Sequence, residues 1–364
     1  MYYIGLMSGT SMDAIDAALV QFKNNQTELI EYLQYPIDEN TKKQIRSVIA
    51  STATEKIDEL DKKLGRLFAE TVKTLMQKAN VDRNMITAIG SHGQTIWHEP
   101  NAPEPFSLQI ANPELIAGET GILTVADFRS ADIAAGGQGA PLAPAFHQFQ
   151  FRHPEKDRVV LNIGGMANVS ILPADRKTAV TGFDTGPGNA LMDDWVRQHQ
   201  NLAMDKNGAW ACSGNCDQEL LSLMLNDEYF QQTPPKSTGI EHFNLDWLSS
   251  FNHSLSPEDV QATLLALTTE TITQAIKHYA PTTKEVLVCG GGVHNKALML
   301  AIKDKLPDCS VASTGEHGLE PDCIEAVAFA WLAKQRLEEI PANLPTVTGA
   351  KKEVLLGTIY DARS

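Results

Sequence analysis

The chain has few cysteines and few basic residues for its length, and both shortages exclude classes of protein. Its five cysteines form no CxxC pair and have no histidine at zinc-finger spacing, which excludes a zinc finger. An odd cysteine count in a chain of 364 residues fits a reducing compartment. Lys and Arg number 30 against 45 Asp and Glu, a net charge of −15. This acidity argues against a nucleic acid partner and an anionic membrane surface, because both select basic patches.

Long apolar runs and the common nucleotide-binding motifs are also missing. No uninterrupted apolar run approaches the roughly 18 residues of a membrane span. The N-terminus MYYIGLMSG lacks the basic region of a signal peptide, so we expect a cytoplasmic protein without membrane contact. No GxxxxGKS/T string occurs and no GxGxxG follows a strand, which excludes P-loop NTPases and the usual dinucleotide fingerprint. Cys212 and Cys216, in CSGNC, could form a disulfide or half a metal site, but the spacing favours two reduced thiols.

The pattern of apolar residues predicts an α/β protein with mixed sheets and two domains, the default for a chain of this length. An apolar strand, a Gly/Ser turn and a second strand occur at the N-terminus and again from Arg158, which suggests a duplication of two α/β halves. Strands are expected at 2–7, 14–22, 29–33, 85–90, 122–126, 158–165, 167–172 and 285–289, and helices at 57–76, 257–279, 295–306 and 325–337.

Three glycine-rich turns carry the candidate chemistry. In MSGTSMD, hydroxyls and backbone amides could cradle phosphates while Asp13 reaches Mg²⁺. An ordinary polar turn explains the same residues equally well. In CGGGVHN, three glycines after an apolar strand suit an adenosine, and a close strand–helix crossing is the alternative.

The third turn, GFDTGPGNALMDDW, sets Asp184 just before a Gly-Pro-Gly run that is expected to open a helix. Free N–H groups at a helix N-terminus attract an anion, and a carboxylate beside them suits a general base. An N-cap or Asx-turn acid is the alternative. Three such turns in one chain suggest an enzyme driven by a nucleotide.

The order of these motifs resembles that of the sugar kinase/Hsp70/actin ATPase superfamily. Within it, the chain is similar to the 1,6-anhydro-N-acetylmuramic acid kinase family. The similarity runs from Met7 to Ala333 through MSGTSMDAID, GSHGQTIWHEP, DFRSADIAAGGQGAPLAPAFH, LNIGGMANVSIL, GFDTGPGNALMDDW, PKSTGIEHFN, VCGGGVHN and EAVAFAWLA. Family members usually have Gly where this chain has Ala14; the difference is one methyl group, and we expect phosphate binding to survive it.

The resemblance implies two actin-like, ribonuclease H-like α/β domains with mixed sheets flanking an interdomain cleft. Domain I would comprise 1–135 and part of the C-terminal segment, and domain II, with the adenosine turn, 136–345. The implied reaction converts 1,6-anhydro-N-acetylmuramic acid, ATP and water to N-acetylmuramic acid 6-phosphate and ADP, in peptidoglycan recycling. The resemblance also implies Mg²⁺ and a homodimer.

It further implies roles for single residues. Asp184 would activate the water, and Asp13 would reach Mg²⁺. The lactyl carboxylate of the sugar would pair with Arg129, for which a salt bridge is the alternative. ATP and its phosphates would contact Gly9, Thr10, Ser11, Met12, Asp13, Ala14, Ile15, Asp16, Gly164, Gly165, Gly186, Gly188, Asn189, Gly290, Gly291 and Gly292.

Four further residues would face the sugar. Ser91, His92 and Gln94, expected straight after a strand, could read sugar hydroxyls, although His92 also fits a satisfied core histidine. Glu325 could orient sugar or water, or simply complement a helix dipole. Two other functions stay open: a kinase of the same superfamily that phosphorylates a free sugar hydroxyl, and a chaperone-like ATPase module.

Overall fold

The computed structural model describes residues 1–9, 12–24, 26–50, 56–251 and 254–361. The chain forms two compact units. Unit 1 comprises Met1–Gln150 and Cys323–Ser364, and unit 2 comprises Phe151–Asp322. These limits differ from the expected division at 135/136 and 345, because α5 (Ala143–Phe151) and α12 (Ile324–Leu337) lie largely or wholly within unit 1.

Unit 1 is built on a mixed sheet which, among the described residues, has seven strands in the order β12-β6-β4-β1-β2-β3, with β5 paired to β4. The first three strands form an antiparallel meander, and β4 and β6 continue the sheet parallel to β1. The strands are β1 (Tyr2–Ser8), β2 (Ala14–Lys23), β3 (Gln26–Pro36), β4 (Ile86–Glu99), β5 (Phe106–Ile110), β6 (Thr124–Ala126) and β12 (Thr358–Tyr360).

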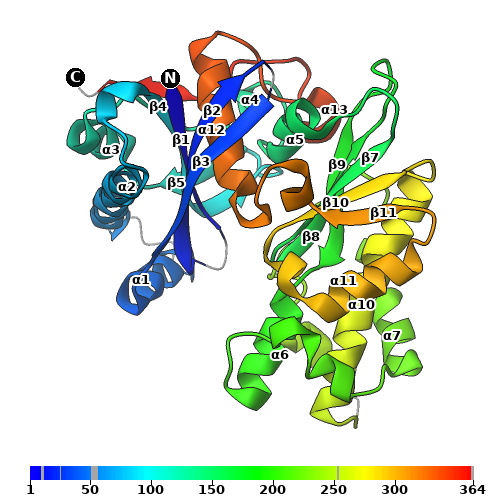
Figure 1. Ribbon diagram of the computed structural model, residues 1–364. Helices are drawn as coiled ribbons and strands as arrows, with labels where there is room; N and C mark the ends of the chain where they lie inside the picture. Colours follow the sequence, from blue (N-terminus) through cyan, green and yellow to red (C-terminus); the bar gives the residue numbers. More distant parts are fainter. Residues whose placement is uncertain (10–11, 25, 51–55, 252–253, 362–364) are drawn as a thin grey trace. The chain divides into compact units, whose positions relative to one another are not determined.

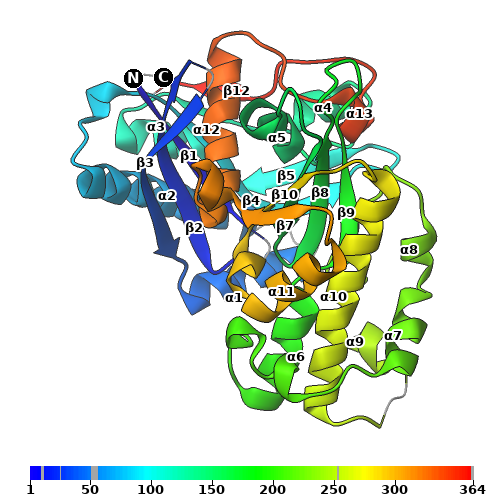
Figure 2. The ribbon, with the colours of Figure 1, turned by 45° about the vertical axis from the view of Figure 1, so that its right-hand side comes forward.

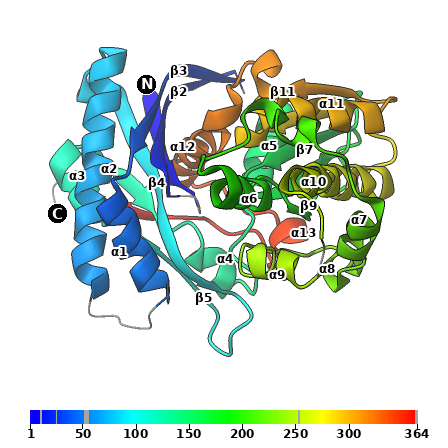
Figure 3. The ribbon, with the colours of Figure 1, turned by 90° about the horizontal axis from the view of Figure 1, so that it is seen from below.

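Helices cover both faces of this sheet (Figures 1 and 3). Alternate residues of a strand point to opposite faces, and Ile4 and Leu6 of β1 pack in one core with Leu64 and Phe68 of α2. The intervening Gly5 faces α12 on the other side. The helices of unit 1 are α1 (Glu39–Ala50), α2 (Ile57–Ala79), α3 (Pro113–Thr120), α4 (Ser130–Ala134), α5, α12 and α13 (Pro345–Thr348).

Two glycines let α12 lie directly on the sheet. A Cβ atom on Gly5 would stand 1.7 Å from the carbonyl oxygen of Ala326, and one on Gly90 would stand 2.0 Å from that of Phe329. No side chain fits in such a gap, so the helix backbone touches β1 and β4 at these points. The alanine-rich face of α12 makes the approach possible and ties the C-terminal segment to the first strand.

Unit 2 repeats the topology of unit 1. Its described residues form a five-stranded sheet in the order β11-β10-β7-β8-β9, again a meander extended by two parallel strands. This repeat supports the duplication suggested by the sequence and confirms the α/β class with two mixed sheets. The strands are β7 (Arg158–Ile163), β8 (Met166–Leu172), β9 (Thr181–Pro187), β10 (Glu285–Cys289) and β11 (Ser310–Ser313).

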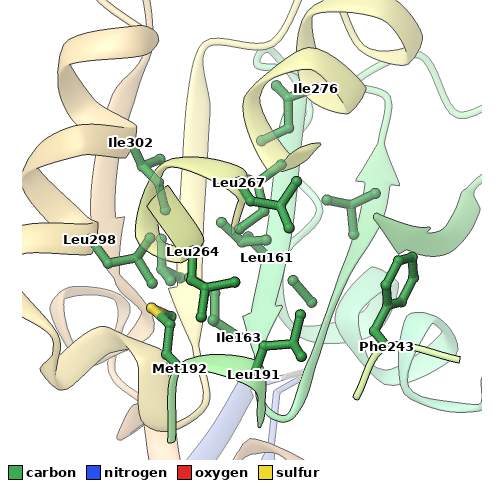
Figure 4. Packing of buried hydrophobic residues seen from close by; sticks show 14 of the residues in the cluster. Leu161, Ile163, Leu191, Met192, Phe243, Leu264, Leu267, Ile276, Leu298 and Ile302 are labelled. Carbon is green, nitrogen blue, oxygen red and sulfur yellow. The ribbon is translucent and has the colours of Figure 1, made fainter. Parts of the chain in front are cut away.

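The long helix α10 packs along the sheet of unit 2 (Figure 2). It begins where Pro257 stands in its first turn and Ser256 accepts a hydrogen bond from the amide of Asp259, a standard helix start. Its Leu264 and Leu267 enter a core with Leu161 of β7 and Ile302 of α11 (Figure 4). The helices of unit 2 are α6 (Ala190–Gln200), α7 (Gln218–Leu225), α8 (Glu228–Gln231), α9 (Leu245–Ser249), α10 (Pro257–Tyr279) and α11 (Lys296–Lys305).

Two sequence expectations about candidate segments were wrong. Ser91, His92 and Gln94 do not follow a strand but lie inside β4, which continues to Glu99 because its second half pairs with β5. Asp184 does not lie in a turn but within β9, while the Gly-Pro-Gly run after it does lead into α6, which begins at Ala190. The polar and glycine residues that predicted turns at these two places therefore belong to strands. Their hydrogen bonds to neighbouring strands outweigh their local preference for turns.

As their spacing favoured, the two cysteines of the string CSGNC are not joined in a disulfide. Cys212 and Cys216 are free thiols. Within the described part of the chain, no group of three or more His, Cys, Asp or Glu side chains could hold a metal ion by itself. The described helices also include none with the length and apolar character needed to cross a membrane.

The contact between α12 and the sheet predicts a large effect of one methyl group. Gly5→Ala must displace the helix backbone, and we expect a loss of about 3 kcal/mol or more in the free energy of unfolding, measured by urea denaturation. Gly118→Ala is the matched control: its Cβ meets nothing within 4 Å, and the helix should gain about 0.5–1 kcal/mol. Equal stability of the two variants would contradict the contact.

Candidate active site

Asp184 is held on strand β9 by a segment that lies far from it in sequence. Its carboxylate Oδ2 accepts a hydrogen bond from the amide of Thr238 at 3.0 Å. Its own amide donates to the carbonyl of Lys236 at 3.2 Å, and its carbonyl accepts from the Tyr229 hydroxyl at 2.7 Å. The backbone of Asp184 is therefore fixed on both sides, while its carboxylate has this single hydrogen bond among the described residues.

The surroundings of Asp184 make its carboxyl group a weaker acid than an ordinary aspartate. Burial raises the pKa of Asp184 to about 6, and Glu241 adds to the rise; the amide of Thr238 and the charge of Lys236 oppose it. The Lys236 ammonium lies 4.5 Å from the centre of the Tyr229 ring and donates to the Tyr229 carbonyl at 3.1 Å. A carboxylate with a pKa near neutrality is well matched to removing a proton from water.

Sequence reasoning missed this supporting set: Tyr229, Lys236, Thr238 and Glu241. Three of them lie in or beside the string PKSTGIEHFN, which was recognised as a matching string but was given no role. The signal in the sequence that could have pointed to these residues was the string PKSTGIEHFN itself. That it packs on β9 follows from the fold and not from any local pattern.

The candidate phosphate and adenosine glycines of unit 2 fall into two groups. A Cβ atom on Gly188, Gly290 or Gly292 would come within 2.4 Å of protein atoms, so these residues permit close packing. Gly164 and Gly291 have more room: a Cβ atom there would make only ordinary van der Waals contacts, at 3.7 Å and 3.9 Å. The close-crossing interpretation therefore explains two of the three consecutive glycines, and only Gly291 leaves room for a ligand.

The other candidates of this region hold the two glycine turns together. The carbonyl of Gly164 accepts from the amide of Asn189 at 2.8 Å, and that of Gly165 accepts from the amide of Gly188 at 2.9 Å. Asn189 also donates through its side chain to the carbonyl of Ile163 at 3.2 Å. Gly186 has φ +143°, and a Cβ atom there would stand 2.7 Å from the Phe230 ring.

The N-terminal turn of unit 1 is described only in part, because Thr10 and Ser11 lie outside the described residues. Gly9 faces open space, and its carbonyl accepts from the amide of Met12, which has a left-handed φ of +57°. Asp13 is exposed and pairs with Lys42 at 3.0 Å.

The remaining candidates of this turn begin strand β2. Ala14, at its first position, pairs with Pro36 of β3, and Ile15 is buried in the core of unit 1. Asp16 accepts from the Tyr32 hydroxyl at 2.5 Å and from Gln34 at 3.1 Å. These contacts account for Ile15 and Asp16 as parts of the sheet.

Two of the residues expected to face the sugar, Arg129 and His92, form a pair within unit 1. The arginine Nε and Nη2 approach the Nε2 atom of His92 at 3.2 and 2.8 Å. Since the guanidinium is a donor, this ring nitrogen must be the acceptor, which leaves the proton on Nδ1, 3.1 Å from the carbonyl of Gly93. Burial and the charge of Arg129 hold the pKa of His92 well below its usual value, so the ring is neutral.

The guanidinium retains free donors in a useful arrangement. Its Nη1 also donates to the carbonyl of Gly139 at 2.8 Å. Three of the five N–H groups are thus used, and one on each terminal nitrogen has no partner among the described residues. Burial lowers the pKa of Arg129 to about 10, and Glu325 opposes the fall, so the group is charged at neutral pH. A charged guanidinium with an unused N–H on each terminal nitrogen is well suited to a carboxylate.

Glu325, at the start of α12, stands in the electrostatic field of this pair. Desolvation by the surrounding protein raises its pKa, Asp16 raises it further and Arg129 lowers it. Nearby, the Ser8 hydroxyl donates to Gln94 Oε1 at 2.7 Å. The Ser91 hydroxyl is buried and has no hydrogen-bond partner among the described residues.

Comparison with known proteins identifies the family. The model of the anhydro-N-acetylmuramic acid kinase family matches residues 1–362. The chain is 48% identical to the anhydro-N-acetylmuramic acid kinase of Pasteurella multocida, over 99% of this chain and 97% of that protein. The kinase of the same name from Coxiella burnetii is 49% identical over 98% and 97%, and that of Aliivibrio fischeri is 47% identical over 99% of both chains.

The chain belongs to the anhydro-N-acetylmuramic acid kinase family. It is therefore an enzyme, a phosphotransferase, as the resemblance in its motifs implied. The structure groups the candidate residues of this kinase within each unit: Arg129, His92 and Glu325 lie together in unit 1. Gly164 and Gly291, which have more room, belong to unit 2, as does Asp184 with its supporting segment.

Proposed function

We propose that the enzyme opens 1,6-anhydro-N-acetylmuramic acid with water and phosphorylates O6 with ATP, giving N-acetylmuramic acid 6-phosphate and ADP. Family membership supports kinase activity on this sugar. The observation that carries the hydrolytic part is Asp184, a carboxylate on a fixed backbone with a pKa of about 6. A product of this kind belongs to peptidoglycan recycling, and a cytoplasmic location and a homodimer remain predictions.

The chemistry at the sugar needs one base. Asp184 takes a proton from water, the water oxygen bonds to C1, and the bond between C1 and O6 breaks. The freed O6 then bonds to the γ-phosphorus of ATP while the bond from that phosphorus to the β,γ-bridging oxygen breaks and ADP leaves, so one sugar oxygen serves first as leaving group and then as nucleophile. No separate protein acid is required, because the negative charge on O6 passes to the phosphoryl group.

Arg129 is the proposed partner of the lactyl carboxylate. Its two remaining N–H donors, one on each terminal nitrogen, offer the bidentate geometry that binds a planar carboxylate. His92 uses the other edge of the guanidinium and stays neutral, so it orients the arginine without adding a competing charge. The free hydroxyl of Ser91 is a candidate contact to the sugar.

The residues present also fit a nucleotide. Gly164 and Gly291 leave backbone exposed where any larger side chain would fill the space, which suits phosphate and adenosine groups. Mg²⁺ takes most of its ligands from phosphates and water, so one carboxylate, the exposed Asp13, is enough to help hold it after release from Lys42. When bound, the ion would neutralise charge on the phosphates.

The whole reaction is tested with Mg·ATP and 1,6-anhydro-N-acetylmuramic acid in ¹⁸O-water. We expect a 6-phosphate that carries one heavy oxygen at C1, read by mass spectrometry before mutarotation exchanges it. Phosphorylation of a free sugar hydroxyl, with the anhydro sugar untouched, would replace the proposal by an ordinary sugar kinase. A slow ATPase stimulated by peptides and not by sugars would support a chaperone-like module.

The role of Asp184 predicts the effect of a single substitution. Asp184→Asn keeps the shape of the side chain but removes its basicity, so kcat should fall by about 10²–10⁴-fold, the usual contribution of a general base. Binding of both substrates, measured by calorimetry, should stay within about threefold, a difference under 1 kcal/mol. Near-normal turnover would remove Asp184 from the role of base.

The raised pKa of Asp184 predicts a pH profile. Because the base works only when deprotonated, kcat/KM should be level above a pH of about 6 and fall about tenfold per unit below it. The charge of Lys236 lowers this pKa, so Lys236→Met should move the acidic limb to higher pH. A profile that is flat through pH 5 in the wild type would contradict the assignment.

A further inference from the structure

The string DFRSADIAAGGQGAP contains a second acid, Asp132, that no role so far explains. Its side chain is fully buried. Oδ2 accepts from the amide of Gly139 at 2.8 Å. Oδ1 accepts from the Asn343 side chain at 2.7 Å and from the Thr348 hydroxyl at 2.7 Å. A buried carboxylate surrounded by neutral donors is costly to form, so its hydrogen bonds must be made together.

Gly139 links this acid to Arg129. Its amide donates to Asp132, and its carbonyl accepts from Arg129 Nη1 at 2.8 Å. The same residue has φ +69°, and Gly136 has φ +85°; glycine takes these left-handed conformations without strain but also has the widest choice of others, so hydrogen bonds restrain this loop to one conformation. The carboxylate of Asp132 supplies such a hydrogen bond, and Gly139 connects it to the guanidinium of Arg129 through a second one.

The far side of Asp132 is held by the C-terminal segment 343–351. Besides the two side-chain donors, the carbonyl of Thr348 accepts from the amide of Gln138 at 2.8 Å, and the amide of Lys351 donates to the carbonyl of Ala135 at 2.9 Å. Asn343 is itself fixed, since its Oδ1 accepts from the amide of Val354 at 2.7 Å. The segment therefore grips the loop 135–139 by backbone and side chain alike.

We propose that Asp132, gripped by the C-terminal segment 343–351, is the positioning residue that aims the guanidinium of Arg129 at the carboxylate of the substrate. This inference rests on the proposed role of Arg129. It adds that the orientation of the arginine is set from two sides: His92 fixes one edge, and the path from Thr348 through Asp132 and Gly139 fixes Nη1. If these hydrogen bonds are lost, the guanidinium of Arg129 keeps its charge but is free to rotate.

The test compares five variants by the KM for the anhydro sugar, the KM for ATP and kcat. Asp132→Asn cannot satisfy both Gly139 and Asn343, because its amide nitrogen must face a donor on one side. We expect its sugar KM to rise about tenfold or more, the scale of a lost charge-assisted contact, with the ATP KM unchanged. Thr348→Val, a milder change that removes one donor, should raise it severalfold.

Two variants separate positioning from mere stability. Asp61→Asn is the matched control: Asp61 also accepts from a backbone amide, that of Ala111, and from an asparagine, Asn112, but has no path to Arg129. It should lower stability without changing the sugar KM. The double variant Asp132→Asn with Asn343→Asp reverses donor and acceptor between the two positions. We expect it to restore the sugar KM only in part, because the carbonyl of Lys352, which accepts from the Asn343 side chain at 3.2 Å, loses its donor.

Hydrogen exchange of residues 129–141 without substrate makes the test independent of the reaction. Asp132→Asn should speed exchange there, and Asp61→Asn should not. A normal sugar KM in both Asp132→Asn and Thr348→Val would overturn the inference, as would an equal rise in Asp61→Asn. If Asp132→Asn does not fold, Thr348→Val decides. A normal sugar KM in Arg129→Met would instead refute the proposed role of the arginine.

Discussion

The fold of unit 1 depends on the direct backbone contact between α12 and the strands β1 and β4. Gly5 and Gly90 remove the side chains that would hold the helix away, and the alanines of α12 complete the fit. Through this contact a segment more than 300 residues from the N-terminus joins the first strand. The same contact brings Glu325, at the start of α12, into the electrostatic field of Arg129. The position of this candidate site residue therefore depends on the packing of Gly5 against the helix.

The surroundings of Asp184 and Asp132 differ in a way that suits the two roles proposed for them. Asp184 has one hydrogen bond to its carboxylate and a raised pKa, which leaves it ready to take a proton. Asp132 has three donors on its carboxylate and is fully buried, which makes it a fixed acceptor in the frame. The number of hydrogen-bond donors on each carboxylate, and not the neighbouring sequence, thus separates the proposed base from the proposed positioning residue.

Glycines divide in the same way. Those at 188, 290 and 292 are required because neighbouring backbone or side chains occupy the place of a Cβ atom, whereas those at 164 and 291 have room for one. Packing glycines set the approach of the turns to the strands, and the others leave backbone for a ligand. The two kinds alternate within a single GGG run, so the motif serves the fold and the site together.

The sequence by itself determined the α/β class, the repeated strand–turn–strand pattern and the family, because apolar periodicity and long specific strings are local properties. It also singled out Asp184, Arg129, His92 and Glu325. It placed His92 and Asp184 wrongly outside strands, and it assigned no role to Lys236, Thr238 or Asp132. Those positions depend on pairing with β5, on the segment that packs against β9 and on the C-terminal grip, all contacts between residues distant in the chain, which only tertiary structure creates.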